Sequence, residues 1–187
     1  MMHHRFLSPE GKSYAFDHRA AGYGRGEGAA CIVIKPLDAA LRDGDHIHSI
    51  IRQTAVNSDG KTDGITQPSA VAHERLIRYA YNKVNLDPLE TDYIEAHGTG
   101  TQAGDPLELK AVGNVFGSTR NSEKPIYVGS VKTNVGHLEA ASGLAGIIKA
   151  SLALKKGIIP PNINFEKANE KIPLKLYNMQ ASLALAV

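Results

Sequence analysis

The chain has 187 residues, of which 42% are apolar and 21% are charged, and its formal net charge is +2. This composition is typical of one globular domain, and the near balance of 21 basic and 19 acidic residues argues against nucleic-acid binding. A single cysteine excludes an internal disulfide, and neither a membrane-spanning apolar run nor a signal peptide is visible, so we expect a cytoplasmic chain that binds no membrane.

The first third of the chain is expected to begin with a loop and to continue with two strands. Alternating glycines between positions 22 and 28 favour a loop up to about residue 30, because glycine weakens a helix interior. The apolar run 29–34, which contains Cys31, is typical of a buried strand, and the alternating stretch 46–56 predicts a second one. Residues 37–42 can form one or two helical turns between them. Because Cys31 has no adjacent histidine and no helix N-terminus to lower its pKa, we interpret it as a buried packing residue.

The rest of the chain is expected to alternate between helices and strands. The predicted elements are, in order, a helix over 70–84 with Ser69 as its N-cap, a strand over 93–96, a helix over 105–116 with Asp105 as its cap, a strand over 126–131, and a helix over 139–155 that ends at Gly157. This order predicts a layered α/β fold with a mixed sheet.

Three patterns that resemble cofactor or metal sites do not fit their surroundings. The glycine-rich stretch 24–29 is followed by a predicted strand instead of the helix that binds a dinucleotide. Phe6 stands where a phosphate-binding loop ending in residues 11–13 needs a glycine. The histidine pairs at 3–4 and at 46 and 48 lack a third ligand at metal-binding spacing. We therefore expect no metal and no directly bound cofactor.

Two further histidines stand in a different setting. His97 and His137 each follow a predicted strand and are surrounded by glycines and other small residues. Glycines allow a ligand to approach the backbone closely, and ligand crevices open at strand ends in layered α/β folds. The pattern favours a functional role for both histidines over a role in core packing.

Residues 95–106 and 129–143 closely resemble the two histidine motifs of β-ketoacyl synthases, in particular the ketosynthase domain of fungal type I highly reducing polyketide synthases. The resemblance extends over nearly everything from Phe6 to Leu174. It implies a thiolase-like fold, layered α/β/α, that is built from two similar halves, with this chain as a partial domain. Residues 1–30 would be the closing loop of a missing N-terminal half, residues 31–175 the C-terminal half, and residues 176–187 a tail that departs from the family pattern.

The resemblance also implies a reaction. In this family a cysteine thiolate takes an acyl chain as a thioester, malonyl on the phosphopantetheine of an acyl carrier protein loses carbon dioxide, and the resulting carbanion attacks the acyl carbon. By position, His97 and His137 would donate the hydrogen bonds that stabilise the developing oxyanion. Lys132 would support the histidines and tune their pKa, and Thr99 and Thr101 would bind the pantetheine arm.

No part of the sequence matches the family's nucleophile motif, and Cys31 aligns with an ordinary strand position. The implied enzyme is an acyltransferase, and its cysteine lies in the N-terminal half that is missing from this chain. The intact enzyme is expected to be a homodimer that acts on malonyl and acyl thioesters together with an acyl carrier protein. The isolated chain is expected not to condense acyl chains. The alternative is a catalytically inactive truncated ketosynthase that only binds carrier protein or a partner subunit.

Overall fold

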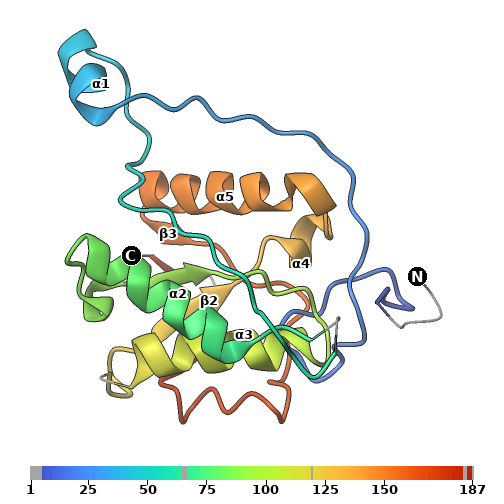
Figure 1. Ribbon diagram of the computed structural model, residues 1–187. Coiled ribbons are helices and arrows are strands. Elements are labelled where there is room, and N and C mark those ends of the chain that lie inside the picture. The colour runs from blue at the N-terminus through green and yellow to red at the C-terminus, as the bar shows by residue number, and fades with distance from the viewer. Residues whose placement is uncertain (1–5, 65–66, 119, 183–184, 187) are drawn as a thin grey trace.

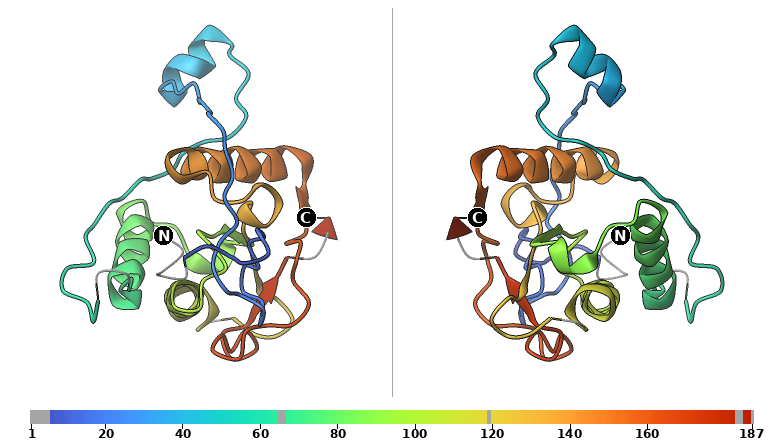
Figure 2. Two further views of the ribbon diagram at one scale, coloured as in Figure 1. Left: turned by 90° about the vertical axis from the view of Figure 1, so that its right-hand side faces the viewer. Right: turned by 90° about the vertical axis from the view of Figure 1, so that its left-hand side faces the viewer.

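The structure is a computed structural model that describes residues 6–64, 67–118, 120–182 and 185–186. Its body has three layers (Figure 1). The helix α5 (Ser142–Lys156) covers one face of a short sheet, and the helices α2 (Ala70–Lys83) and α3 (Gly104–Val112) lie on the other side. Two views from the sides show the same order of layers (Figure 2). The layered α/β/α architecture expected from the sequence is therefore present.

The central sheet contains three parallel strands in the order β1 (Tyr93–Glu95), β2 (Ile126–Gly129) and β4 (Met179–Ala181). In register, Ile94 lies beside Val128, and Val128 beside Ala181. A separate antiparallel pair is formed by β3 (Ile158–Ile159) and β5 (Leu185–Ala186). The two strand directions of the expected mixed sheet are thus divided between two small sheets, and the C-terminal tail supplies one edge of the parallel one.

The core lies between the parallel sheet and the helices beside it. Leu109 of α3 and Phe116 of the π-helix Gly113–Gly117 are fully buried, as are Ile126 and Val128 of β2. Phe16 from the N-terminal loop enters the same cluster. The loop before residue 26 is therefore part of the body of the molecule.

A buried carboxylate also holds this N-terminal loop in place. Asp17 is fully buried, forms an ion pair with Arg19 at 2.8 Å, and accepts the backbone N–H groups of Glu166 and Lys167 at 2.6 and 3.1 Å. Although burial raises the pKa of Asp17, these hydrogen bonds lower it more, so the group stays ionised. The loop is thereby fixed to the segment that follows β3.

The helix predictions from local pattern are confirmed. The Ser69 hydroxyl accepts the N–H of Ala72 at the start of α2, and Gly157 ends α5 in the left-handed conformation. The remaining helical segments are α1 (Leu37–Asp43), η2 (Pro88–Glu90), α4 (Lys132–Val135) and η4 (Glu139–Ala141). Of these, α4 lies between β2 and His137, in a stretch for which no helix was predicted.

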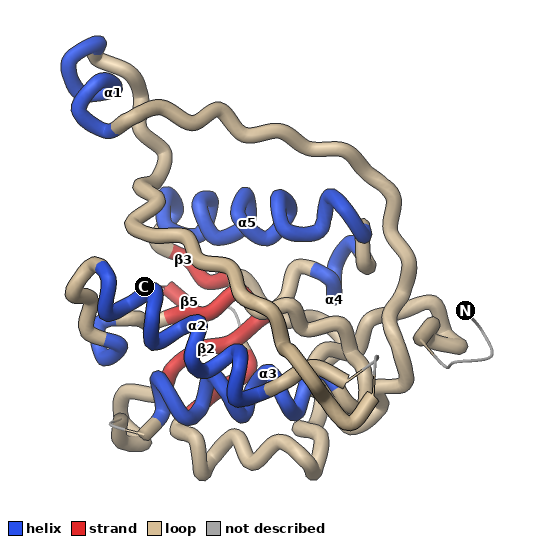
Figure 3. The backbone as a smooth tube through the Cα atoms, viewed as in Figure 1, coloured by secondary structure: helices blue, strands red, loops and turns tan. Residues whose placement is uncertain are grey.

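The two strands expected over residues 29–34 and 46–56 are not formed. Residues 29–36 run as an extended arm that leads to α1, away from the three layers (Figures 1 and 3). The stretch 46–56 returns from α1 beside α5, where the Ser151 hydroxyl donates to that of Ser49 at 2.9 Å. Val33 is completely exposed, and the interpretation of Cys31 as a buried packing residue is wrong because it too is exposed. A strand needs a neighbouring backbone to pair with, and no other described strand pairs with either segment.

No helix in the described parts of the chain combines the length and apolar character needed to cross a membrane.

Candidate active site

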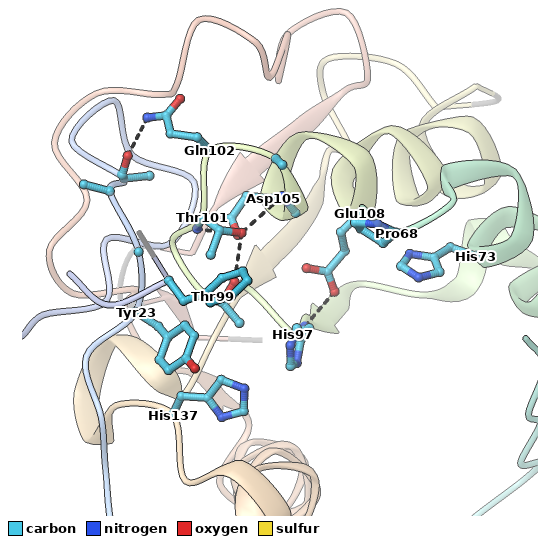
Figure 4. A pocket seen from close by; sticks show the side chains of 16 residues that line it. Tyr23, Pro68, His73, His97, Thr99, Thr101, Gln102, Asp105, Glu108 and His137 are labelled. Atoms are coloured by element: carbon cyan, nitrogen blue, oxygen red, sulfur yellow. Dashed lines mark hydrogen bonds between the residues drawn. The ribbon is translucent and has the colours of Figure 1, made fainter. Parts of the chain in front are cut away.

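His97 and His137 meet at one edge of the parallel sheet. His97 follows β1 after a single residue, and His137 follows β2 by way of α4. Because β1 and β2 are adjacent and parallel, their carboxyl ends lie at the same edge. The imidazole rings are nearly perpendicular, at 86°, with their centroids 5.2 Å apart (Figure 4).

The loop that carries His97 is shaped by a carboxylate that the sequence analysis did not single out. Glu108 of α3 accepts the backbone N–H of His97 at 2.6 Å and that of Gly98 at 2.9 Å (Figure 4). Gly98 has a φ of +46°, and a Cβ at this position would lie only 2.6 Å from the Cβ of Ser130. Ser130 in turn donates its hydroxyl to the carbonyl of His97 at 3.1 Å. The two histidine motifs therefore pack directly against one another.

Asp105 has a different role from the expected helix cap. Its buried carboxylate accepts the N–H groups of Phe16 at 2.9 Å and of Gly100 at 3.1 Å, while the first residues of α3 have no side-chain cap from Asp105. Burial raises its pKa to about 7. The prediction of a cap is wrong because the carboxylate binds the backbone N–H groups of Gly100, in the preceding loop, and of Phe16, in the N-terminal loop.

The orientation of His137 is fixed by a backbone hydrogen bond. Its Nδ1 accepts the N–H of Glu139 at 2.9 Å. A nitrogen that accepts a hydrogen bond carries no proton, so in the neutral ring the proton is on Nε2. The ring of Tyr23 packs against His137 with the centroids 4.9 Å apart.

Burial and the nearby charge of Lys132 keep the two histidines neutral. Burial, and after it the positive charge of Lys132, lower the pKa of His97 to about 4. The same two causes, burial first, lower the pKa of His137. Lys132 is itself buried, and burial lowers its pKa while Glu108 and Glu95 oppose this effect. Both imidazoles are therefore uncharged at neutral pH and can donate one N–H each.

Thr99 and Thr101 lie beside the histidines, with their hydroxyl oxygens 3.2 Å apart. The Thr101 hydroxyl also accepts the N–H of Gly104 at 3.1 Å, which stabilises the start of α3. Both threonines line a cleft of about 830 Å³ together with His97 and His137. The five residues singled out from the sequence are thus gathered in one region, although Lys132 is buried and is not among the described residues that line the cleft.

The cleft has other polar residues that the sequence analysis missed. Glu108 could have been found, because it lies one helical turn after Asp105 and so on the same side of α3. His73 of α2 also lines the cleft, and only the packing of α2 against α3 brings it there. Its position carries no local sequence signal.

Comparison with known proteins assigns this arrangement to a family. The family description "Beta-ketoacyl synthase, C-terminal domain" matches residues 48–166, and "Beta-ketoacyl synthase, N-terminal domain" matches residues 1–40. The chain is 58% identical to the highly reducing polyketide synthase poxF of Penicillium oxalicum over 96% of its own length, and 57% identical to AN6791 of Emericella nidulans over 97%. It spans only 7% of the length of each of these relatives.

Solved structures give the same assignment. The ketosynthase from module 6 of the bacillaene synthase of Bacillus subtilis 168 superposes with a TM-score of 0.93 at 40% identity. That alignment covers 97% of this chain and 32% of the ketosynthase. An oxazolomycin ketosynthase domain from Streptomyces albus superposes with a TM-score of 0.90 at 33% identity, covering 96% of this chain and 31% of that one. The fold is therefore that of part of a thiolase-like ketosynthase, and the chain belongs to the β-ketoacyl synthase family.

Proposed function

We propose that the chain is the C-terminal part of a β-ketoacyl-(acyl-carrier-protein) synthase of a polyketide synthase, and that His97 and His137 promote decarboxylation of a malonyl thioester. The observation that carries this proposal is the perpendicular pair of neutral imidazoles, 5.2 Å between centroids, at the wall of an open cleft. A substrate oxygen that approaches the pair from the cleft would accept a hydrogen bond from each ring.

The chemistry follows from where charge develops. When the malonyl thioester loses carbon dioxide, the electron pair of the broken carbon–carbon bond moves toward the thioester carbonyl and places negative charge on its oxygen. An N–H donor aimed at such an oxygen contributes about 2.7 to 4 kcal/mol to the stability of the transition state. His137 offers Nε2–H because its Nδ1 already accepts the Glu139 amide. The carbanion then attacks an acyl thioester, or takes a proton from water when no acyl group is present.

The substrate would be carried on the phosphopantetheine of an acyl carrier protein, and no cofactor would be bound directly. Thr99 and Thr101 support this assignment because their hydroxyls lie in the wall of the cleft beside both histidines. A hydroxyl pair can donate to the amide carbonyls of the pantetheine arm and accept from its amide N–H groups. Lys132 would act through the histidines by keeping their pKa low.

The nucleophilic cysteine would come from an N-terminal half outside this chain. Cys31 is exposed and lies on the extended arm, outside the cleft that contains the histidines. We also propose that residues 1–30 close the N-terminal half, that residues 31–175 form the C-terminal half with 176–187 as its tail, and that the intact enzyme, an acyltransferase, is a homodimer. The departure of the arm from the body near residue 29 supports the first of these divisions.

The proposal is tested by incubating the purified chain with malonyl-pantetheine and measuring release of carbon dioxide and formation of acetyl-pantetheine. We expect slow decarboxylation, no condensation, and a loss of about 100-fold or more in the rate in each of His97→Ala and His137→Ala. Cys31→Ser is the matched control and should retain the rate.

Two results would contradict this assignment. Acylation of Cys31 by an acyl thioester, detected by mass spectrometry, would show that the chain carries its own nucleophile. Binding of carrier protein with no decarboxylation at all would favour the alternative, an inactive binding module.

A further inference from the structure

We propose that Glu95 and Lys149 form a positioning pair that holds Lys132 in its place near the two histidines. This inference rests on the proposed function, since it assigns a role to the surroundings of residues taken to act in decarboxylation. Glu95 is the last residue of β1, two positions before His97, and Lys149 lies in α5. Neither is among the described residues that line the cleft, so each would act through Lys132 and not on the substrate.

The carboxylate of Glu95 binds groups from three elements of the fold. Its Oε1 accepts the backbone N–H of Val131, just after β2, at 2.5 Å. Its Oε2 lies 2.7 Å from Nζ of Lys149 in α5, and it also accepts a hydrogen bond from the hydroxyl of Tyr93, which is on the same face of β1. Burial, and after it the charge of Glu95, raise the pKa of Tyr93, so this hydroxyl keeps its proton and remains a donor.

The ion pair is enclosed between α5 and the sheet. The side chains of Glu95 and Lys149 are each only 10% exposed, and the ammonium lies 5.5 Å from the centroid of the Tyr93 ring. Removal of one partner from such a pair leaves a charge without compensation, whereas replacement of both by neutral side chains costs little stability. The two residues are therefore expected to behave as one unit.

The hydrogen bond to Val131 fixes the segment that carries Lys132. The paired part of β1 and β2 ends with Glu95 beside Gly129. Beyond that point the Glu95 carboxylate holds the N–H of Val131, while the carbonyl of Val131 accepts the N–H of Val135 at 3.1 Å and so begins the turn of α4. Lys132 is the first residue of α4. A displacement of Val131 would therefore displace the backbone of Lys132.

The charge of Glu95 also acts on the Lys132 ammonium. Burial lowers the pKa of Lys132, and the carboxylates of Glu108, Glu95 and Asp105 oppose this effect, in that order. Loss of the Glu95 charge should therefore lower the pKa of Lys132. Because Lys132 in turn lowers the pKa of both histidines, Glu95 would support the electrostatics of the site without touching it.

Two double variants separate the hydrogen bond from the charge. Glu95→Gln/Lys149→Met removes both charges but retains an oxygen that can accept the Val131 N–H, whereas Glu95→Leu/Lys149→Met removes the acceptor as well. The readouts are hydrogen exchange of the Val131 amide and titration of the Lys132 side chain by 13C NMR, both on the full chain.

The Val131 amide should exchange at least about tenfold faster in the leucine variant and within about threefold of the wild-type rate in the glutamine variant. The pKa of Lys132 should fall in both. In the decarboxylation assay the leucine variant should lower kcat by about tenfold, the glutamine variant should lower it less, and KM for malonyl-pantetheine should stay within about threefold. Lys149→Met alone leaves the carboxylate unpaired, so its urea midpoint should lie below that of Glu95→Gln/Lys149→Met.

Asp92→Asn/Lys124→Met is the matched control. This ion pair, at 4.0 Å, joins the residues before β1 to those before β2, at the opposite end of the same two strands, and more than half of each side chain is exposed. It should leave the exchange of Val131, the pKa of Lys132 and kcat unchanged.

An unchanged pKa of Lys132 in both double variants would overturn the proposal, as would wild-type exchange of Val131 and wild-type kcat in Glu95→Leu/Lys149→Met. If the leucine variant does not fold, the titration of Lys132 in Glu95→Gln/Lys149→Met decides the question. Neither NMR readout depends on turnover, so a chain that shows the expected exchange and titration but no decarboxylation contradicts the proposed function instead.

Discussion

The carboxylate of Glu108 lies 2.6 Å from the backbone nitrogen of His97 and also accepts the N–H of Gly98, so a side chain of α3 fixes the backbone on which the first histidine stands. Removal of this acceptor leaves two backbone N–H groups without a partner. Each partly buried N–H group that loses its hydrogen bond lowers the free energy of unfolding by about 1 to 3 kcal/mol. Glu108→Ala should therefore lower the free energy of unfolding by about 2 to 4 kcal/mol. Glu108→Gln keeps one acceptor oxygen and should lose about half as much. Urea denaturation of both variants measures the difference, and equal losses would contradict it.

A substitution at Lys132 tests whether its charge lowers the pKa of the two histidines. Its charge lowers the pKa of both His97 and His137, in each case as the second cause after burial. Lys132→Met keeps much of the buried volume and removes the charge, so the pKa of both histidines should rise. Titration of the imidazole carbon-bound protons by NMR reports each pKa separately. A fall in either pKa, or no change in both, would show that Lys132 does not act on the histidines through its charge.

The depressed pKa of His97 predicts a dependence of stability on pH. The folded chain resists protonation of His97 until about pH 4, whereas the unfolded chain takes up that proton near pH 6.5. The contribution of His97 to the free energy of unfolding is therefore fully present above pH 6.5 and is lost as the pH falls toward 4. The raised pKa of Asp105 and of Glu108 acts in the opposite direction in part of this range.

The difference between the wild type and His97→Ala isolates the histidine from these carboxyl groups. Between pH 7 and pH 5, the Tm of the wild type should fall by more than the Tm of the variant. Parallel curves for the two proteins would contradict the depressed pKa.

Gly98 tests the close contact between the two histidine motifs. A side chain at this position meets both a positive φ and the Cβ of Ser130 at 2.6 Å, so Gly98→Ala should cost about 2 kcal/mol or more of stability and should displace His97. Gly143→Ala in α5 is the matched control, because a Cβ there meets no atom within 4 Å and alanine favours a helix. Thermal unfolding of both variants gives the comparison. If Gly98→Ala left the stability unchanged, the loop would have space for a Cβ, and the close contact with Ser130 would be contradicted.

The elements that were predicted well are those whose signals are local. The helix α2 has a capping serine and apolar residues at helical spacing, and α5 ends at a glycine that can adopt the left-handed conformation. The strands β1 and β2 are short apolar segments bounded by loops, and each is followed by one of the histidines. Such signals depend only on neighbouring residues, and they are sufficient to place His97 and His137 at strand ends.

The errors occurred where the environment is set by distant parts of the chain. The run around Cys31 has the composition of a buried strand, but no described strand pairs with it and it stays exposed. Asp105 has the position of a helix cap, but the free amides of Phe16 and Gly100 draw its carboxylate to the loop instead. In both cases the local pattern is real, but contacts outside it decide the outcome: the Cys31 segment pairs with no described strand, and Asp105 binds the Phe16 amide 89 positions away.

The amino-acid sequence by itself determined the family, the order of most elements and the residues with the chemistry of the site, because motifs and periodicity are properties of adjacent positions. Only the tertiary structure decided that the two imidazoles stand perpendicular with their centroids 5.2 Å apart, that Glu108 supports one, and that Glu139 fixes the proton position of the other. These relations depend on hydrogen bonds and packing between segments that only the fold brings together. The two histidine motifs are therefore readable in the sequence, whereas the geometry that would let them act on one oxygen atom is a property of the folded chain.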